Sequence, residues 1–167
     1  MLSAETAAGA FPVHAVKTMD SVVRQTEAYL WKHGAFRFVS HQPVAESPLE
    51  VSDAVAKATA QLSRDLRVRA IFVMSRTGLT ARIVTSSRPA APVLGVSPDE
   101  RTARAMQLLW GVVPFAASPE EWENPEELAR RLVRQYGVAT DGDHILRVSG
   151  FHTDGDLNIP SISVLRV

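Results

Sequence analysis

Short apolar runs alternate with helical stretches over residues 49–167, and this alternation constrains the fold of the chain most strongly. The run at residues 68–74 is apolar almost throughout, which is typical of a strand buried on both faces. Strands that alternate with helices predict a mostly parallel sheet covered by helices on both sides, an α/β three-layer sandwich. The last two runs leave no room for a helix between them, so we expect an antiparallel hairpin at one edge. The predicted strands are residues 68–74, 92–96, 111–115, 144–148 and 162–167.

Two of the expected helices are marked by their apolar spacing. Residues 80–86 form a short helix after the first strand. A longer helix opens at Pro48, before that strand, and carries apolar residues spaced by three or four. Its predicted buried face consists of Val51, Val55, Ala58, Leu62 and Leu66.

Cap patterns mark the starts of three further helices. Ser97 and Ser118 each precede a proline and stand three residues before a glutamate, which is the capping-box pattern. The helix that starts at Ser97 is predicted to end near Trp110. Asn124 begins a third such pattern, and the longer helix that follows it is predicted to end at Gly137.

The first 48 residues have a separate organisation. Val16, Met19, Val23 and Leu30 recur at helical spacing, and Pro12 suits a first helical position. Residues 31–48 lose this pattern and contain one glycine and two prolines, which is typical of a connection. We therefore expect a first segment at 1–30 that contains a helix from Pro12 to Leu30, a connection at 31–48 and the α/β domain at 49–167.

Composition excludes several classes of function. Lys+Arg and Asp+Glu both number 18, so the chain has no net positive charge for nucleic acid to recognise. There is no cysteine, which excludes disulfides and thiolate chemistry, and the five histidines lack metal-ligand spacing. No apolar run approaches the ~20 residues of a membrane helix, and the first residues lack the features of a secretory signal. A cytoplasmic protein without membrane or nucleic-acid partners is expected.

The turn after the first strand is the strongest candidate for a binding site. Ligands of open α/β sheets bind at the carboxyl ends of strands, and a helix start there favours an anion. Gly78 allows backbone conformations that other residues resist. The turn contains hydroxyls and cations suited to phosphate, at Ser75, Arg76, Thr77, Thr80 and Arg82. Two interpretations stay open, a phosphate site and an ordinary turn with Thr77 as the helix cap.

Several short motifs occur together in an order that resembles pyruvate kinases. Residues 1–9 read MLSAETAAG and are followed by Phe11-Pro12, where the family usually has tyrosine and proline. In that family such a stretch ends the last strand of the catalytic barrel and begins its last helix. The later motifs TGLTAR at 77–82, RPAAP at 88–92 and WGVVP at 110–114 resemble the family's carboxy-terminal α/β domain.

The resemblance implies that catalytic parts are missing from this chain. Pyruvate kinases transfer a phosphoryl group from phosphoenolpyruvate to ADP, using magnesium and potassium held mainly by earlier barrel strands. Only Ser3, Glu5 and Thr6 match the barrel side, so no complete catalytic set and no metal site is expected. We therefore expect a truncated fragment that is inactive alone. The alternative is a free-standing domain that binds a phosphorylated metabolite, although a barrel remnant would then have no purpose.

The resemblance also implies a regulatory role in glycolysis for the α/β domain. In the family this domain binds allosteric activators, often sugar phosphates or AMP, and forms subunit contacts, so a homo-oligomer is expected. The effector-phosphate loop aligns with Ser75, Arg76, Thr77, Gly78 and Thr80. Further effector contacts come from the helix after the third strand and the loop between the last two strands. Here that last loop carries Asp154 and Asp156, which favours a monophosphate over a bisphosphate ligand.

Overall fold

The computed structural model describes residues 2–33 and 48–167, which fall into two compact units, Met1–Gln42 and Pro43–Val167. The predicted connection at 31–48 lies almost wholly outside the described residues. Within the described part, no helix is long and apolar enough to cross a membrane.

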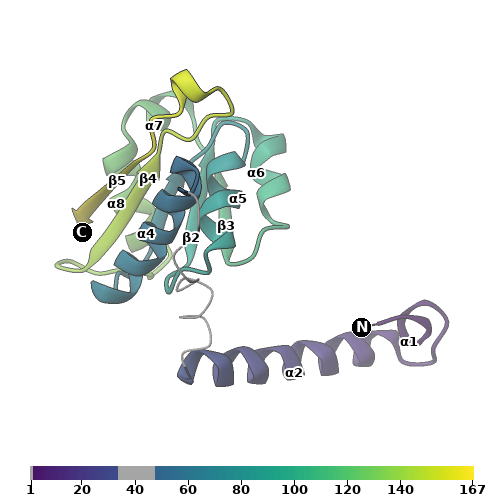
Figure 1. Cartoon of the computed structure of the whole chain (residues 1–167). Helices are drawn as coiled ribbons and strands as arrows, with labels where there is room; N and C mark the ends of the chain where they lie inside the picture. The colour runs from purple at the N-terminus through teal and green to yellow at the C-terminus, as the bar shows by residue number, and fades with distance from the viewer. Residues whose placement is uncertain (1, 34–47) are drawn as a thin grey trace. The chain divides into compact units, whose positions relative to one another are not determined.

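The second unit contains one five-stranded sheet with strand order β3-β2-β1-β4-β5 (Figure 1). The first four strands are mutually parallel, and β5 pairs antiparallel with β4 at the edge. This is the predicted α/β arrangement with an antiparallel edge hairpin, and it is confirmed. The strands are β1 (Ile71–Met74), β2 (Val93–Ser97), β3 (Val112–Ala116), β4 (His144–Ser149) and β5 (Ser161–Arg166).

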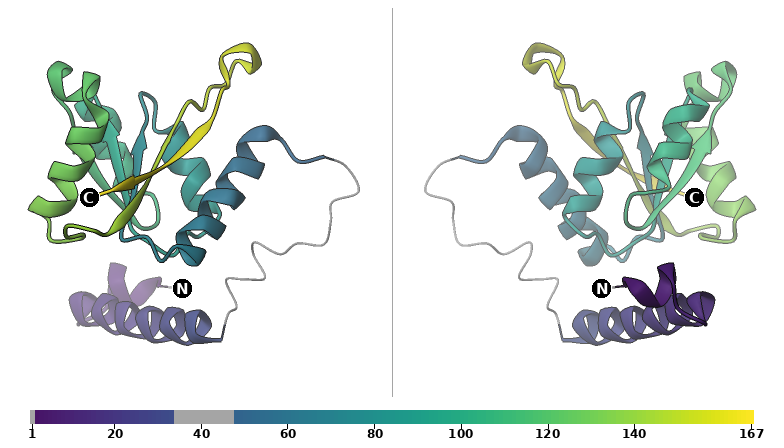
Figure 2. Two further views of the ribbon diagram at one scale, coloured as in Figure 1. Left: turned by 90° about the vertical axis from the view of Figure 1, so that its left-hand side faces the viewer. Right: turned by 90° about the vertical axis from the view of Figure 1, so that its right-hand side faces the viewer.

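Helices cover both faces of the sheet, which gives the three predicted layers (Figures 1 and 2). On one face lie α4 (Val51–Asp65), α5 (Leu79–Ser86) and α6 (Glu100–Met106), and on the other α7 (Pro119–Glu123) and α8 (Pro125–Gln135). Strand β1 contributes to both cores. Ile71 and Val73 pack into the first, and Phe72 packs into the second.

Strand β1 begins three residues later than predicted, because the chain is still leaving α4. Arg67 has a positive φ of 48°, and the Val68 N–H donates to the Ser63 carbonyl at 3.2 Å. These features end the helix in the manner of a C-cap motif. Residues 68–70 therefore belong to the turn and to the first bonds of the sheet.

The predicted buried face of α4 was wrong in part. Val51, Ala58 and Leu66 are exposed, whereas the fully buried positions are Ala56, Thr59, Ala60 and Ser63. The small side chains of this stripe allow α4 to pack closely against α5. Burial here follows the fit between two helices rather than side-chain hydrophobicity.

The predicted cap of α6 was also wrong. Ser97 is the last residue of β2, and Asp99 caps the helix by accepting from the N–H groups of Arg101 and Thr102. The helix ends at Met106 rather than near Trp110, because residues 107–111 turn to reach β3. Gly111 at φ 66° completes that turn.

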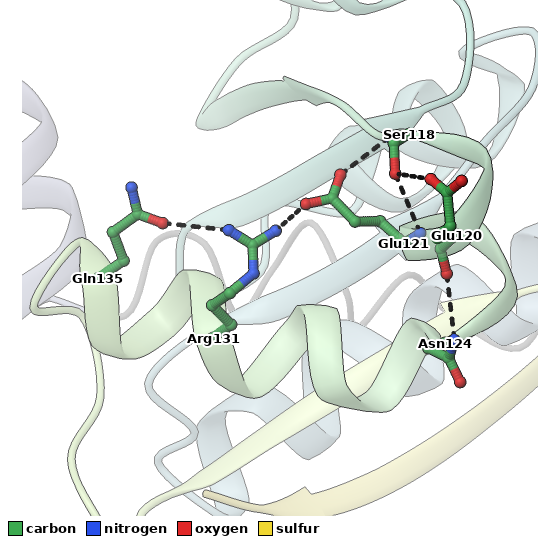
Figure 3. A network of polar contacts seen from close by, with 6 residues as sticks. All are labelled: Ser118, Glu120, Glu121, Asn124, Arg131 and Gln135. Carbon is green, nitrogen blue, oxygen red and sulfur yellow. Dashed lines mark hydrogen bonds and ion pairs between the residues drawn. The ribbon is translucent and has the colours of Figure 1, made fainter.

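A polar network joins α7 to α8 (Figure 3). The predicted capping box is confirmed: the Glu121 N–H donates to Ser118 Oγ, and the Ser118 N–H donates to the Glu121 carboxylate. Arg131 of α8 pairs with that same carboxylate and bonds to Gln135. Asn124 precedes α8 as predicted, but its side chain donates to the Glu120 carbonyl instead of capping the helix. The predicted end of α8 is confirmed, with Gly137 at φ 63°.

Strand β3 lies at an edge of the sheet and carries Pro114. Proline has no N–H to donate, so it is tolerated where the ladder is unpaired on one side. Proline on an edge also discourages pairing with another chain.

The first unit contains α1 (Ala4–Ala7) and α2 (Pro12–Lys32). The predicted helix starting at Pro12 is confirmed. The end of a barrel strand that the resemblance implies for residues 1–9 is not observed among the described residues, because Ala4–Ala7 form α1. A strand needs neighbours for its hydrogen bonds, and none of the described strands pairs with this segment.

The neck of the β4–β5 hairpin provides a test of the fold. Gly150 has φ 88°, and a Cβ atom there would lie 2.0 Å from the Ile159 carbonyl oxygen. We expect Gly150→Ala to lower the free energy of unfolding by about 2 kcal/mol or more, because positive φ and this contact both disfavour alanine.

Gly155→Ala in the same loop is the matched control, since a Cβ there meets nothing within 4 Å. Urea denaturation of both variants measures the difference. Equal midpoints for the two variants would contradict the observed hairpin geometry.

Candidate functional site

A pocket of about 410 Å³ opens beside the carboxyl end of β1. Three segments build it: the turn from β1 into α5, the inner side of α6, and the start of the β4–β5 loop. Its lining residues are Thr77, Gly78, Leu79, Arg82, Thr102, Ala105, Met106, Leu109, Phe151, His152 and Thr153. The position agrees with the rule that open α/β sheets bind ligands beyond their strand ends.

The structure divides the predicted phosphate residues into two layers. Thr77 and Gly78 line the pocket, and Gly78 adopts a left-handed conformation with φ 80°. Ser75 and Thr80 lie beneath them with exposures of 4% and 2%. The Thr80 N–H donates to Ser75 Oγ at 3.2 Å, so these two residues hold the turn in shape.

Thr77 is not the N-cap of α5, which is Gly78. The Leu79 N–H approaches Thr77 Oγ1 at 3.4 Å, a long hydrogen bond. The turn thus provides an acceptor for one of the free N–H groups at the start of α5. The side chains that line the pocket remain the main groups available to a ligand.

Arg76 lies away from the pocket. Its guanidinium carbon is 5.1 Å from the centroid of the Trp122 ring, a cation–π contact. Trp122 packs against the core on the α7–α8 face, whereas Met106 of the pocket packs in the core on the opposite face. The network in Figure 3 holds the Trp122 helix to α8 and so maintains this orientation of Arg76.

Arg82 is the cation of the pocket. It lies one helical turn beyond Gly78, is exposed, and forms no ion pair with the residues that the structure describes. In the part of the chain that the structure describes, no aspartate or glutamate lines the pocket. Its electrostatic character is therefore positive, and its remaining walls are largely apolar.

Asp99 orders the α6 wall. Its carboxylate accepts from Thr102 Oγ1 at 2.7 Å and from the Thr102 N–H at 2.9 Å. These bonds to the Thr102 side chain and backbone hold the pKa of Asp99 below its usual range. Thr102 is thereby fixed with its methyl group toward Gly78, where a Cβ would lie 3.7 Å from Thr102 Cγ2.

The segments in which effector contacts are predicted differ in their relation to the pocket. The β4–β5 loop does line the pocket, through Phe151, His152 and Thr153, but the helical wall is α6, which follows β2 rather than β3. Asp154 and Asp156 do not line the pocket. The Asp154 carboxylate instead accepts from the Asp156 N–H at 3.1 Å.

Sequence reasoning did not single out Thr102, Met106 or His152 as pocket residues. Their common property is position: two lie on the inner side of α6 and one follows the last parallel strand. Only a strand order that places β1 between β2 and β4 brings these segments together. No local sequence motif predicts that these three residues lie together.

The barrel-side residues Ser3, Glu5 and Thr6 lie in or beside α1 in the first unit. Ser3 and Glu5 are exposed, and Thr6 Oγ1 donates to the Ser3 carbonyl at 2.9 Å. Within the described ranges, no group of three or more His, Asp or Glu side chains could hold a metal ion.

Comparisons with known proteins agree with this architecture. The family model described as the pyruvate kinase alpha/beta domain matches residues 53–163. A pyruvate kinase from Agrobacterium vitis is 35% identical over 155 residues, which cover 90% of this chain and 31% of the relative. A pyruvate kinase from Kluyveromyces lactis is 31% identical over 161 residues, with 90% and 31% coverage.

Solved structures give the same result. A pyruvate kinase from Cryptosporidium parvum is 26% identical, with a TM-score of 0.77, and the match covers 99% of this chain and 32% of that one. A structure of the Cryptosporidium parvum enzyme in complex with ADP has a TM-score of 0.73 at 26% identity, with 99% and 33% coverage.

The fold and the pocket define an α/β domain with a ligand-sized pocket at its parallel strand ends. The family match covers more than half of the residues, and the chain belongs to the pyruvate kinase alpha/beta domain family. It corresponds to the carboxy-terminal portion of these proteins and spans about a third of the length of the relatives it matches.

Proposed function

We propose that the chain is the regulatory carboxy-terminal part of a pyruvate kinase and that its pocket binds a phosphorylated small molecule. The pocket at the start of α5 carries the proposal, because it combines a left-handed glycine, hydroxyls and an arginine that forms no ion pair with any described residue. The volume of about 410 Å³ lies within the usual range for small-molecule sites.

The positions of the charges favour a single phosphate. Among the described residues, Arg82 is the only lysine or arginine that lines the pocket, and Arg76 is engaged with Trp122. The phosphate is expected between Arg82 and Thr77, where charge-assisted hydrogen bonds form. Met106, Leu109 and Phe151 offer an apolar surface for the rest of the ligand. A sugar monophosphate or AMP fits this description better than a bisphosphate.

Arg82→Gln tests the phosphate contact. We expect it to weaken binding of ribose 5-phosphate about tenfold or more, because a charge-assisted bond is worth ~1.5–3 kcal/mol. Isothermal titration calorimetry with ribose 5-phosphate, glucose 6-phosphate, AMP and fructose bisphosphate measures the affinities.

Arg101→Gln on α6 is the charge-matched control, since Arg101 does not line the pocket. An equal loss of affinity in both variants would indicate a general charge effect. No binding of any ligand by the unmutated chain at millimolar concentration would refute the proposed site.

We further propose that the 167-residue chain alone does not catalyse phosphoryl transfer. That reaction requires positioned metal ions and charges around the transferring group, and the described residues provide no metal-ligand cluster. A lactate-dehydrogenase-coupled assay with phosphoenolpyruvate, ADP, magnesium and potassium measures the turnover. A rate near a typical enzyme value, about 10 per second, would show that this proposal is wrong.

We also propose that copies of this chain associate through helix α2. Val13, Val16, Met19 and Val23 form an exposed apolar stripe on this helix, with exposures of 38% or more. Such stripes drive association or are covered by another surface. Val16→Glu places a charge within the stripe and is expected to shift the chain toward monomer.

Ser21→Glu introduces the same charge outside the apolar stripe and is the control. Sedimentation velocity over a range of concentrations measures the species present. An unmutated chain that sediments only as a monomer would refute the proposal.

A further inference from the structure

A second cavity opens on the other face of the sheet, between the edge strand β3 and helix α8. Val113 and Leu94 are paired in register and so face the same side of the sheet, yet Val113 is 42% exposed whereas Leu94 is 1% exposed. Helix α8 therefore covers β2 and leaves the neighbouring side of β3 open. The resulting gap, which we call the β3–α8 groove, is lined by residues of β2, β3, α7 and α8 and has a volume of about 190 Å³.

The interior of the β3–α8 groove is apolar and partly aromatic. Its floor contains Val96, Leu128 and Leu132, which are at most 5% exposed and belong to the core under α8. Its wall is formed by Phe115 and Tyr136, whose ring centroids lie 5.0 Å apart with an interplanar angle of 62°. Tyr136 is 54% exposed, so part of its ring is open to contact. An aromatic ligand can add to such a pair by edge or offset contacts.

The volume of the groove limits a ligand to one small ring. A dry apolar cavity of about 150 Å³ is large enough to hold benzene, whereas drug-sized ligands occupy clefts of about 300–1,000 Å³. A groove of about 190 Å³ therefore admits a single aromatic ring with one short substituent. It has no room for a complete nucleotide.

The polar rim of the groove has no net charge. In the described part of the chain, Arg131 and Glu121 are the charged residues that line it, and they form an ion pair with each other. Both carboxylate oxygens of Glu121 are engaged, one by Arg131 and the other by the Ser118 N–H. A charged ligand would lose hydration here without meeting a counter-charge that is available to it. The rim therefore favours a neutral ligand.

Gln135 supplies hydrogen-bonding groups for such a ligand. Figure 3 shows Arg131 lying between Gln135 and Glu121. The Gln135 side-chain oxygen accepts from Arg131 at 3.4 Å, which is a long hydrogen bond, and its N–H₂ group bonds to no described residue. A glutamine amide offers two donors and an acceptor, so an amide on the ligand is its direct complement.

We propose that the β3–α8 groove binds a neutral, single-ring aromatic amide, with the ring against Tyr136 and Phe115 and the amide paired with Gln135. The groove lies over the core under α8, whereas the phosphate pocket with Met106 lies over the core on the opposite face of the sheet. The inference therefore concerns a second site and does not depend on the proposed function.

Benzamide and benzoate test the ligand class, because they share a ring and differ mainly in charge. The amide signals of the labelled full chain are recorded during titration with each compound. We expect benzamide to give saturable shifts at Phe115, Gln135 and Tyr136, with a dissociation constant in the millimolar range or below, as its small size dictates. Benzoate should bind about tenfold more weakly, since its charge would lie beside Glu121.

Two outcomes of this titration would overturn the proposal. One is the absence of a saturable shift at these three residues with benzamide at millimolar concentration. The other is benzoate binding as tightly as benzamide, or more tightly, because the rim would then not select a neutral molecule.

Two replacements of Tyr136 test the aromatic wall. Tyr136→Ala removes the ring and should weaken benzamide binding about tenfold, whereas Tyr136→Phe keeps the ring and should bind benzamide like the unmutated chain. Tyr136 is largely exposed, so neither change is expected to disturb the core. Unchanged affinity in the alanine variant would overturn the aromatic contact.

Gln135→Ala tests the amide contact. It should weaken benzamide binding about threefold to tenfold, which corresponds to the loss of one neutral hydrogen bond. Gln107→Ala is the matched control, because Gln107 is an exposed glutamine at the end of α6 and lies outside the groove. Equal affinities of these two variants for benzamide would overturn the role of Gln135.

Discussion

Burial of β1 on both faces is the constraint on which the rest of the second unit depends. Ile71 and Val73 fill one core and Phe72 the other, and all three are completely buried. Full burial of each such side chain is worth about 1.5–3 kcal/mol. Because both layers of helices pack against this one strand, its carboxyl end has a defined position. The turn from Ser75 to Gly78 follows β1 directly, so its position is set by the end of that strand.

The pocket follows from how closely the helices approach that strand end. Gly95 of β2 makes room for α6, since a Cβ there would lie 3.1 Å from Met106 Sδ and 3.0 Å from Val112 Cγ1. Met106 is then buried beneath the pocket while Thr102, one turn earlier, faces Gly78. Arg76 lies away from the pocket, because its guanidinium stacks over the ring of Trp122, which packs on the opposite face of the sheet. Positive charge in the pocket therefore comes from Arg82 alone among its lining residues.

The sequence was sufficient to predict the strands, their direction and most helix starts, because these depend on local apolar patterns and caps. It misplaced the buried face of α4, where close contact with α5 selects Ala56 and Ala60 over larger neighbours. The prediction also named Ser97 as the cap of α6 in place of Asp99. Both residues have suitable side chains, and the sequence does not show that β2 extends through Ser97. A local motif does not show which of two adjacent elements a residue joins, or which helix face packs against a neighbouring helix.

The candidate site was predictable only where it is local. Thr77 and Gly78 belong to a recognisable turn, and the pocket contains them. His152, Thr102 and Met106 come from segments that meet only after the strand order is set, and the Ser52–Asn158 bond joins residues 106 positions apart. Which side of the sheet Arg76 faces depends on Trp122, whose place is fixed by the α7–α8 network.

An NMR titration of the labelled chain with ribose 5-phosphate tests the central claim most directly, because it locates binding residue by residue. We predict saturable shifts of the amide signals of Thr77, Gly78 and Leu79, together with those of Thr102 and His152. The amides of Arg130 and Arg134 on α8 serve as an internal reference, since these arginines lie outside the pocket and are ion-paired. Shifts confined to α8, or no saturable shift anywhere, would contradict the claim that the pocket binds a phosphorylated molecule.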